Sequence, residues 1–268
     1  MYDTNINSKE KLSSLSVFFP CYNEEENIGR LLDLSIKIFP KYTDDLEIIV
    51  INDGSTDKTS EIAHKYAKRY SFIRVVDQEN SGGYGGAIKR GFSEVTKDWV
   101  FFTDADLQFD LTEFEKFAKV ALSTDDDLII GYRIKRAEGY KRLILAMGMK
   151  FLAWITVGFP LTIKDTDCAF KLIKRKVLVR VGKLESTSNL ITTEFLLKAK
   201  KKGFSFYQIG VNHYCRLYGE SKCSDSKAIL DVLRDLIKLN YIVYIRPFIE
   251  NLHPKKLEME KVQKTIEA

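Results

Sequence analysis

The sequence predicts an α/β protein with a mostly parallel sheet, helices on both faces of the sheet, and a C-terminal helical extension. Short, almost continuously apolar runs recur through the first 135 residues, amphipathic segments separate them, and polar residues follow where the runs end. Strands that are apolar on both sides are typical of parallel sheets covered on both faces. The alternation of strand and helix predicts right-handed crossovers that place helices on both faces.

Five apolar, β-rich runs are predicted to form the strands of the sheet. They lie at residues 15–19, 46–51, 72–76, 99–102 and 128–131. A helix is predicted between the first two runs, because apolar residues recur there at helical spacing from Ile28 to Phe39. Asn23 is its predicted N-cap, with Glu26 as the capping-box partner.

A second apolar stripe at helical spacing follows the second strand. Its members are Ile62, Ala63, Tyr66, Ala67 and Tyr70. Ser55 or Asp57 is predicted to cap this helix, since both residue types accept hydrogen bonds from first-turn N–H groups. The next apolar helix is predicted at residues 140–157.

Composition limits the possible partners and compartments. A net charge of +5 and a pI near 8.8 fit an anionic partner such as a phosphate compound or a lipid surface. Nucleic acid is not expected, since the charge is small and no known nucleic-acid motif accompanies it. Four cysteines without a CxxC pair predict free thiols in the cytoplasm. No signal peptide or transmembrane span is expected, because the longest uncharged stretch has 13 residues.

Ligands of open α/β sheets bind beyond the carboxyl ends of the strands, so the polar residues there are the candidate site. One of these ends reads DADLQ, and in an extended chain Asp104, Asp106 and Gln108 point the same way. Two carboxylates held so close repel each other unless a cation lies between them. A simple polar turn is the alternative, since aspartate is common in turns.

Three other strand ends carry weaker signals. Tyr22 is a candidate to stack on a base and Glu24 to bind a base or ribose, although PCYNEEENI also reads as a strand exit before a helix. Asp53 is either a nucleoside contact or an ordinary turn residue. The segment NSGGYGGAIKRG fits neither a Rossmann fingerprint nor a P-loop. Its glycines permit close backbone approach, and Gly83 and Lys89 are candidates for a diphosphate or sugar contact.

The order of these segments resembles family 2 glycosyltransferases of the GT-A fold. PCYNEEENI, INDGSTD, SGGYGGA, DADLQ, GYR, KDTDCAFK and HYCRLYGESK occur in the order seen in that family. The similarity is closest to the polyprenyl-phosphate sugar synthases, such as dolichyl-phosphate mannose synthase, and runs from about Ser14 to Lys222. It covers most of the chain.

The resemblance implies that Asp104 and Asp106, with Gln108 beside them, hold Mg²⁺ or Mn²⁺ against the diphosphate of a nucleotide-sugar donor. Both ions take oxygen ligands, commonly from one or two carboxylates and substrate phosphates. The resemblance also assigns a set of residues to the nucleoside. They are Pro20, Tyr22, Glu24 and Asp53.

By the same resemblance, Arg133 and Arg142 correspond to residues that bind phosphate in the lipid-acceptor branch. The residues of the family's loop that closes over the diphosphate and acceptor phosphate are Arg216, Ser221 and Lys222. Some positions depart from the family pattern, since Ala146 stands in place of a serine and Asp167 and Ala169 in place of Gln and Gly. The paired C-terminal membrane helices of many relatives are also missing. These departures leave acceptor identity and membrane attachment open.

The implied reaction is an inverting sugar transfer from a UDP- or GDP-sugar to a polyprenyl phosphate at the cytoplasmic face of the membrane. Such an acceptor is already charged near neutral pH and hardly needs a general base. Glu194 lies near the family's acidic pair for hydroxyl acceptors, but Phe195 replaces the aspartate. The alternatives are transfer to a sugar hydroxyl, a nucleotidyltransferase, and a non-catalytic nucleotide-sugar-binding subunit.

The chain is predicted to divide into a catalytic domain at residues 1–223 and an amphipathic helix with a charged tail at 224–268. Peripheral contact with the inner face of the cell membrane is expected through residues 143–163 or 226–246. The second segment is also compatible with docking on the protein's own core. A separate membrane protein is a further candidate partner.

Overall fold

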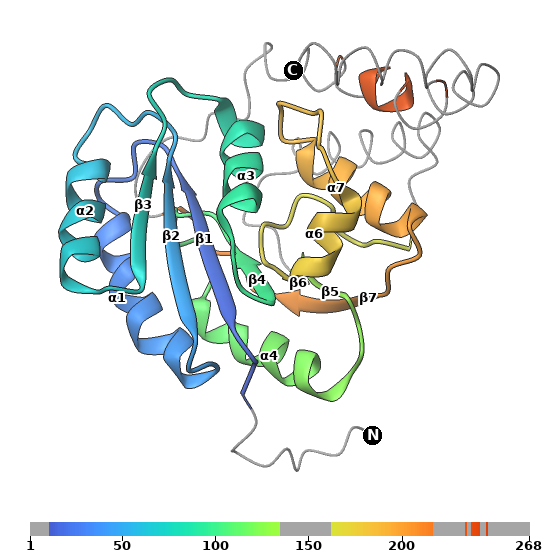
Figure 1. Ribbon diagram of the computed structural model, residues 1–268, viewed down its shortest axis with the longest axis horizontal. Helices are drawn as coiled ribbons and strands as arrows, with labels where there is room; N and C mark the ends of the chain where they lie inside the picture. Colours follow the sequence, from blue (N-terminus) through green and yellow to red (C-terminus); the bar gives the residue numbers. More distant parts are fainter. Residues whose placement is uncertain (1–10, 135–161, 217–233, 235–236, 242–244, 246–268) are drawn as a thin grey trace, which may run out of the picture.

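The structure is a computed structural model that describes residues 11–134, 162–216, 234, 237–241 and 245 (Figure 1). Seven strands form one sheet in the order β3-β2-β1-β4-β6-β5-β7. The strands are β1 (Leu15–Cys21), β2 (Leu46–Asn52), β3 (Ile73–Asp77), β4 (Trp99–Phe102), β5 (Leu128–Arg133), β6 (Lys171–Lys174) and β7 (Phe206–Val211). The predicted apolar helix at 140–157 lies outside the described residues.

The sheet is mostly parallel, as predicted. Strands β3, β2, β1 and β4 pair in parallel, and so do β5 and β7. Strand β6 runs antiparallel to both of its neighbours, β4 and β5. Six strands therefore end at one edge of the sheet, and β6 begins there. All five predicted strands are confirmed, whereas β6 and β7 were not predicted.

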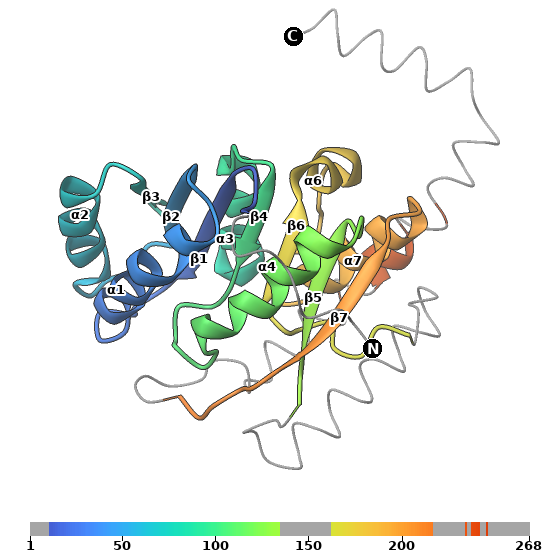
Figure 2. The same ribbon diagram turned by 90° about the horizontal axis from the view of Figure 1, so that it is seen from below.

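Helices cover both faces of the sheet. They are α1 (Ile28–Ile38), α2 (Thr59–Arg69), α3 (Gly83–Glu94), α4 (Phe114–Ser123), α6 (Arg175–Val181) and α7 (Ile191–Lys201). Figure 2 shows α1 and α4 along one face and α3 and α6 along the other. Helix α7 lies on the α3 side, where the rings of Phe92 and Phe195 are 5.1 Å apart. Aromatic rings fill the core, with Phe101 packed edge-on against both Phe114 and Phe170.

The predicted cap of the first helix is wrong. Helix α1 begins at Ile28, and its N-cap position is Asn27. Asn23 instead adopts φ of +56°, a left-handed conformation that asparagine tolerates better than most residues. Its side-chain oxygen accepts a hydrogen bond from the N–H of Thr56, 2.8 Å away. Asn23 therefore joins the loops after β1 and β2. The N-cap position of α2 is Lys58, so neither Ser55 nor Asp57 occupies it. The carboxylate of Asp57 nevertheless accepts from the N–H of Thr59, the first residue of α2.

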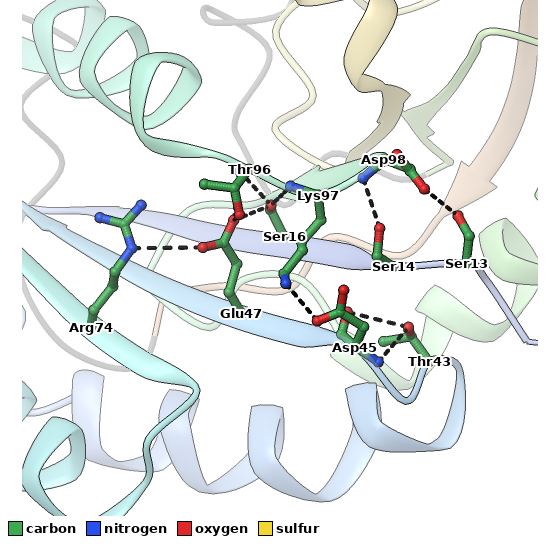
Figure 3. Close-up of polar contacts among 10 residues, drawn as sticks. All are labelled: Ser13, Ser14, Ser16, Thr43, Asp45, Glu47, Arg74, Thr96, Lys97 and Asp98. Carbon is green, nitrogen blue, oxygen red and sulfur yellow. Dashed lines mark hydrogen bonds and ion pairs between the residues drawn. The ribbon is translucent and has the colours of Figure 1, made fainter.

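A polar network joins the amino ends of the central strands, away from the candidate site (Figure 3). The buried hydroxyl of Ser16 bonds to Glu47 on β2 and accepts from the N–H groups of Thr96 and Lys97, just before β4. Burial alone would raise the pKa of Glu47, but the hydrogen bonds from Ser16 and Thr96 and the charge of Arg74 outweigh it, and the pKa is lowered. The network therefore fixes the spacing of β1, β2 and β4.

Replacing Ser16 with alanine should lower the free energy of unfolding by about 1–3 kcal/mol, because buried N–H groups and a carboxylate lose a partner. Urea denaturation measures the change. Ser13→Ala is the matched control, since exposed Ser13 also bonds to a carboxylate, that of Asp98, and should change stability by less than about 0.5 kcal/mol. Equal effects of the two substitutions would contradict the role given to the network.

Candidate active site

The candidate site lies at the edge where six strands end. Strand β1 has β2 on one side and β4 on the other, so the connections after β1 and β4 lead away in opposite directions. Such a switch point leaves a crevice between the two loops. Glu24 follows β1, and Asp104 and Asp106 follow β4. The two sequence segments predicted to bind the donor therefore meet at this crevice.

The two aspartates lie in a strained loop. Leu107, directly after Asp106, has φ of +57°, which is rare for a residue other than glycine. Asp106 is 4% exposed, and its Oδ1 accepts a hydrogen bond from the N–H of Gln108 at 3.1 Å. Burial and the neighbouring charge of Asp106 raise the pKa of Asp104 to about 7. A nearby cation would therefore stabilise the ionised pair.

A cationic side chain already lies at this pair. Nη2 of Arg216 is 2.7 Å from Oδ2 of Asp106. The segment before Arg216 is bound to the acidic loop, because Tyr214 and Gln108 exchange two hydrogen bonds and Phe109 bridges to His213. The side-chain amide nitrogen of Gln108 donates one of these bonds to the carbonyl of Tyr214. Residues far apart in the sequence are thus assembled around Asp106.

The residues present fit a divalent cation. The Oδ1 atom of Asp104 is buried and has no hydrogen-bond partner within the described part of the chain. Such an oxygen is a ready ligand for Mg²⁺ or Mn²⁺, which protein sites often hold with two carboxylates and substrate phosphates. Among the residues that the structure covers, no three histidine, cysteine, aspartate or glutamate side chains form a metal site on their own.

Asp53 is buried and holds the glycine-rich segment in place. Its carboxylate accepts hydrogen bonds from the N–H of Gly82 at 2.8 Å, the hydroxyl of Ser81 at 2.6 Å and the amide of Gln78 at 2.7 Å. Gly83 then starts α3 with φ of +68°. These contacts make Asp53 an organiser of the glycine-rich segment, whatever else it binds.

A second loop closes over this segment. A Cβ atom on Gly85 would lie 2.6 Å from the backbone of Thr187, so only glycine fits there. Lys89, on the next turn of α3, is partly buried. The start of α3 therefore lies between Asp53 on one side and the loop that contains Thr187 on the other.

The predicted nucleoside residues lie at the end of β1. Pro20 belongs to the strand, and Tyr22, which follows it, is 36% exposed. Burial raises the pKa of Glu24, even though its carboxylate accepts a hydrogen bond from Asn27 at 2.7 Å. The backbone N–H of Glu24 donates to the hydroxyl of Thr59 on α2. This places an aromatic ring and a carboxyl group next to the crevice.

Arg133, at the end of β5, forms a bidentate ion pair with Asp165. Its Nε and Nη2 atoms are 2.7 and 2.9 Å from the two carboxylate oxygens, and both side chains are largely buried. Asp165 belongs to the segment that leads into β6. In the structure, Asp165 fixes the orientation of Arg133, the arginine that was predicted to bind phosphate.

Lys171, the first residue of β6, is a buried cation that the sequence analysis missed. It is fully buried, pairs with Phe102 at the end of β4, and donates hydrogen bonds to the carbonyl groups of Thr166 and Cys168. Burial lowers its pKa, while Asp165 and other nearby charges act in the opposite direction. In the sequence, Lys171 stands inside the apolar run AFKLI and is the last residue of the segment KDTDCAFK. Lys171 holds the turn that positions Asp165.

Replacing Lys171 with methionine should lower donor turnover by about 10-fold or more, since residues that orient a site typically contribute 10- to 100-fold. Steady-state kinetics and thermal unfolding measure the effect. Lys174→Met is the matched control, because Lys174 lies on the same strand. Its ammonium group also donates to a backbone carbonyl, that of Asp125, and lies over the ring of Trp99. If both variants lose equal stability and equal activity, the positioning role of Lys171 is wrong.

The carboxylate of Glu194 forms hydrogen bonds and an ion pair within the protein. It is fully buried on α7 and accepts hydrogen bonds from the N–H groups of Glu185 and Ser186 at 2.7–3.1 Å. Lys198 lies 2.6 Å from its Oε1 atom. Burial alone would raise the pKa of Glu194, but these bonds lower it. The arrangement gives Glu194 a structural role in holding the loop that covers Gly85, and the structure offers no support for its use as a general base.

Three predicted site residues lie outside the part of the chain that the structure describes. They are Arg142, Ser221 and Lys222. Their assignments stay predictions. No helix within the described residues is long and apolar enough to cross a membrane.

Comparison with known proteins identifies relatives of known activity. A "Dolichyl-phosphate beta-glucosyltransferase" of Trichomonas vaginalis is 32% identical over 60% of this chain and 53% of its own length. An "Undecaprenyl-phosphate 4-deoxy-4-formamido-L-arabinose transferase" of Photorhabdus laumondii is 29% identical over 86% of this chain and 69% of its own. The chain thus spans about half the length of the dolichyl-phosphate relatives that it matches.

A solved structure confirms the predicted GT-A fold. Glucosyl-3-phosphoglycerate synthase from Mycobacterium tuberculosis, in complex with Mn²⁺, uridine diphosphate and glucosyl-3-phosphoglycerate, superposes with a TM-score of 0.64. The alignment covers 85% of this chain and 79% of that one, at 19% identity. The family model for "Glycosyl transferase family 2" matches residues 16–182, which is more than half of the chain. The chain therefore belongs to glycosyl transferase family 2, as its motifs predicted.

Proposed function

We propose that the protein transfers a sugar, with inversion, from a UDP- or GDP-sugar to a polyprenyl phosphate. The observation that carries the proposal is the pair of carboxylates, Asp104 and Asp106, at the switch point beside Arg216. Relatives named for dolichyl phosphate and undecaprenyl phosphate support a lipid-phosphate acceptor. This site is built to hold a diphosphate through a divalent cation and an arginine.

In the proposed reaction, the end of β1 and the loops after β1 and β2 bind the nucleoside. The residues are Pro20, Tyr22, Glu24 and Asp53. Asp104 and Asp106, with Gln108 beside them, would hold Mg²⁺ or Mn²⁺. The cation, when bound, supplies charge stabilisation for the departing nucleoside diphosphate. The guanidinium of Arg216 binds diphosphate oxygens, because its planar fork meets them two at a time.

The acceptor side needs no general base from the protein. A phosphate monoester has its second pKa near 6, so it carries a nucleophilic oxygen at neutral pH. This oxygen attacks the anomeric carbon opposite the leaving group, through an oxocarbenium-like state. Arg133, held by Asp165, binds the acceptor phosphate, together with Arg142, Ser221 and Lys222. The carboxylate of Glu194 already accepts hydrogen bonds from Glu185 and Ser186, which supports a phosphate acceptor over a sugar hydroxyl.

The protein is proposed to act at the cytoplasmic membrane face through peripheral contact. Within the described part of the C-terminal extension, Leu239 is buried and Lys238 bonds to the carbonyl of Glu185. Ile237, Tyr241 and Ile245 lie four residues apart and are 44–74% exposed. One side of this segment therefore docks on the protein, and the other presents apolar side chains that suit a lipid surface. Flotation with anionic liposomes tests this contact, and a protein that stays in the soluble fraction contradicts it.

The decisive experiment screens UDP- and GDP-sugars for metal-dependent transfer to a short polyprenyl phosphate. The matched control acceptor is the corresponding polyprenol, which has the same chain without the phosphate. We expect transfer to the phosphate alone. Transfer to sugar hydroxyls with no reaction on the lipid phosphate would favour a polysaccharide-synthesising enzyme of the same fold. A protein that binds donor but never turns over would instead be a nucleotide-sugar-binding subunit.

A further inference from the structure

The guanidinium of Arg216 lies among three carboxyl groups from two different loops. It forms the 2.7 Å ion pair with Oδ2 of Asp106, and it interacts electrostatically with Glu24 and Asp104. Glu24 follows β1, and the two aspartates follow β4. Arg216 therefore supplies positive charge at the place where the proposed function puts a divalent cation.

The backbone that carries Arg216 is fixed to the acidic loop. The N–H of Tyr214 donates to the carbonyl of Gln108 at 2.8 Å, and the amide of Gln108 donates back to the carbonyl of Tyr214 at 2.9 Å. Phe109 and His213 form a β-bridge next to these bonds. A change of partner by the Arg216 side chain consequently does not require the two loops to separate.

Both carboxylate oxygens of Asp106 already have a partner in the structure. Its Oδ1 accepts from the N–H of Gln108, and its Oδ2 is paired with Arg216. A guanidinium and a divalent ion on one carboxylate would lie a few ångströms apart, and like charges at that distance repel strongly in a partly buried site. The diphosphate of a donor, in contrast, offers oxygens that match the arginine fork.

We propose that Arg216 is an exchangeable counter-ion of Asp106. Its side chain leaves Asp106 when a divalent cation binds there, and it moves to the diphosphate of the donor. The inference rests on the proposed function and adds a mechanism for the order of binding. Because the nucleotide gives the displaced arginine a new partner, nucleotide and metal should each strengthen binding of the other, by the same factor.

The test measures Mn²⁺ affinity by electron paramagnetic resonance, with and without UDP, in the wild-type protein and in Arg216→Met. Without UDP, Arg216→Met should bind Mn²⁺ at least about fivefold more tightly, because the competing cation is gone. The gain in Mn²⁺ affinity on adding UDP should shrink in the same variant. Arg74→Met is the matched control, since it removes an equal charge from an ion pair with Glu94, outside this site, and should leave Mn²⁺ affinity unchanged.

Arg216→Lys serves as a second variant, with intermediate Mn²⁺ affinity expected because it keeps the charge but loses the planar fork. Unchanged or weaker Mn²⁺ binding by folded Arg216→Met overturns the proposal, and so does an equal gain in Arg74→Met. The Mn²⁺ assay contains neither a sugar donor nor an acceptor. A protein that shows the exchange but no sugar transfer would therefore refute the proposed function and leave the exchange intact. Absence of Mn²⁺ binding in every variant would overturn the exchange together with metal dependence.

Discussion

Replacing Asp106 with asparagine should reduce sugar transfer by roughly 10³-fold or more, a size typical of lost charge stabilisation at a reacting group. Asparagine keeps the shape of the side chain and an oxygen that accepts from the N–H of Gln108. It lacks the negative charge that would hold a divalent cation and that pairs with Arg216. Turnover of nucleotide sugar with a polyprenyl phosphate, measured beside thermal unfolding, gives the result.

Asp110→Asn is the matched control for this experiment. Asp110 lies four residues further on, is exposed, and accepts a hydrogen bond from the N–H of Thr112 at the start of the 3₁₀ helix Leu111–Glu113. Its replacement should leave transfer close to the wild-type rate. A folded Asp106→Asn protein that keeps a tenth of its activity would show that the carboxylate pair is not the centre of the reaction.

The parts of the fold that the sequence predicted are those set by local pattern. Strands β1, β2, β4 and β5 are nearly continuous apolar runs with mostly buried residues, so their signal needs no knowledge of distant residues. Strand β3, at the edge of the sheet, is only partly buried but keeps the apolar residues Ile73, Val75 and Val76. The acidic part of the site could be predicted from these strands, because Asp104 and Asp106 come just after the apolar run of β4. Strand β6 was missed because its four residues include Lys171 and Lys174, and strand β7 because its apolar and polar residues are mixed.

The rest of the site depends on contacts between distant segments, which a single sequence does not reveal. Arg216 lies 110 residues from Asp106, and Asp165 lies 32 residues from Arg133. Asn23 was read as a helix cap because its neighbours fit that pattern, but a hydrogen bond across the two loops fixes it elsewhere. In these three cases, the partner of the polar side chain lies more than 30 residues away in the chain.

Substitution of Glu194 tests whether its carboxylate takes part in catalysis or only stabilises the folded protein. Glu194→Gln should keep transfer within about threefold of wild type at low temperature, whereas loss of a general base would cost 10²- to 10⁴-fold. The same substitution should lower the free energy of unfolding by about 2–3 kcal/mol, because it removes the charge that pairs with Lys198 and weakens the bonds to Glu185 and Ser186. Lys198→Met is the matched control, since it removes the same ion pair without touching the carboxylate.

The pH dependence of stability distinguishes the two roles further. The pKa of Glu194 is lower in the folded protein than its ordinary value of 4.5, so the ionised carboxylate stabilises the folded state at neutral pH. This contribution should be lost as the pH falls below about 4.5 and through the folded pKa, and Glu194→Gln should show a shallower loss of stability there. Urea denaturation between pH 7 and pH 3 measures it. Equal acid sensitivity in both proteins would mean that the buried carboxylate does not hold the loop over Gly85, and its catalytic use would then have to be reconsidered.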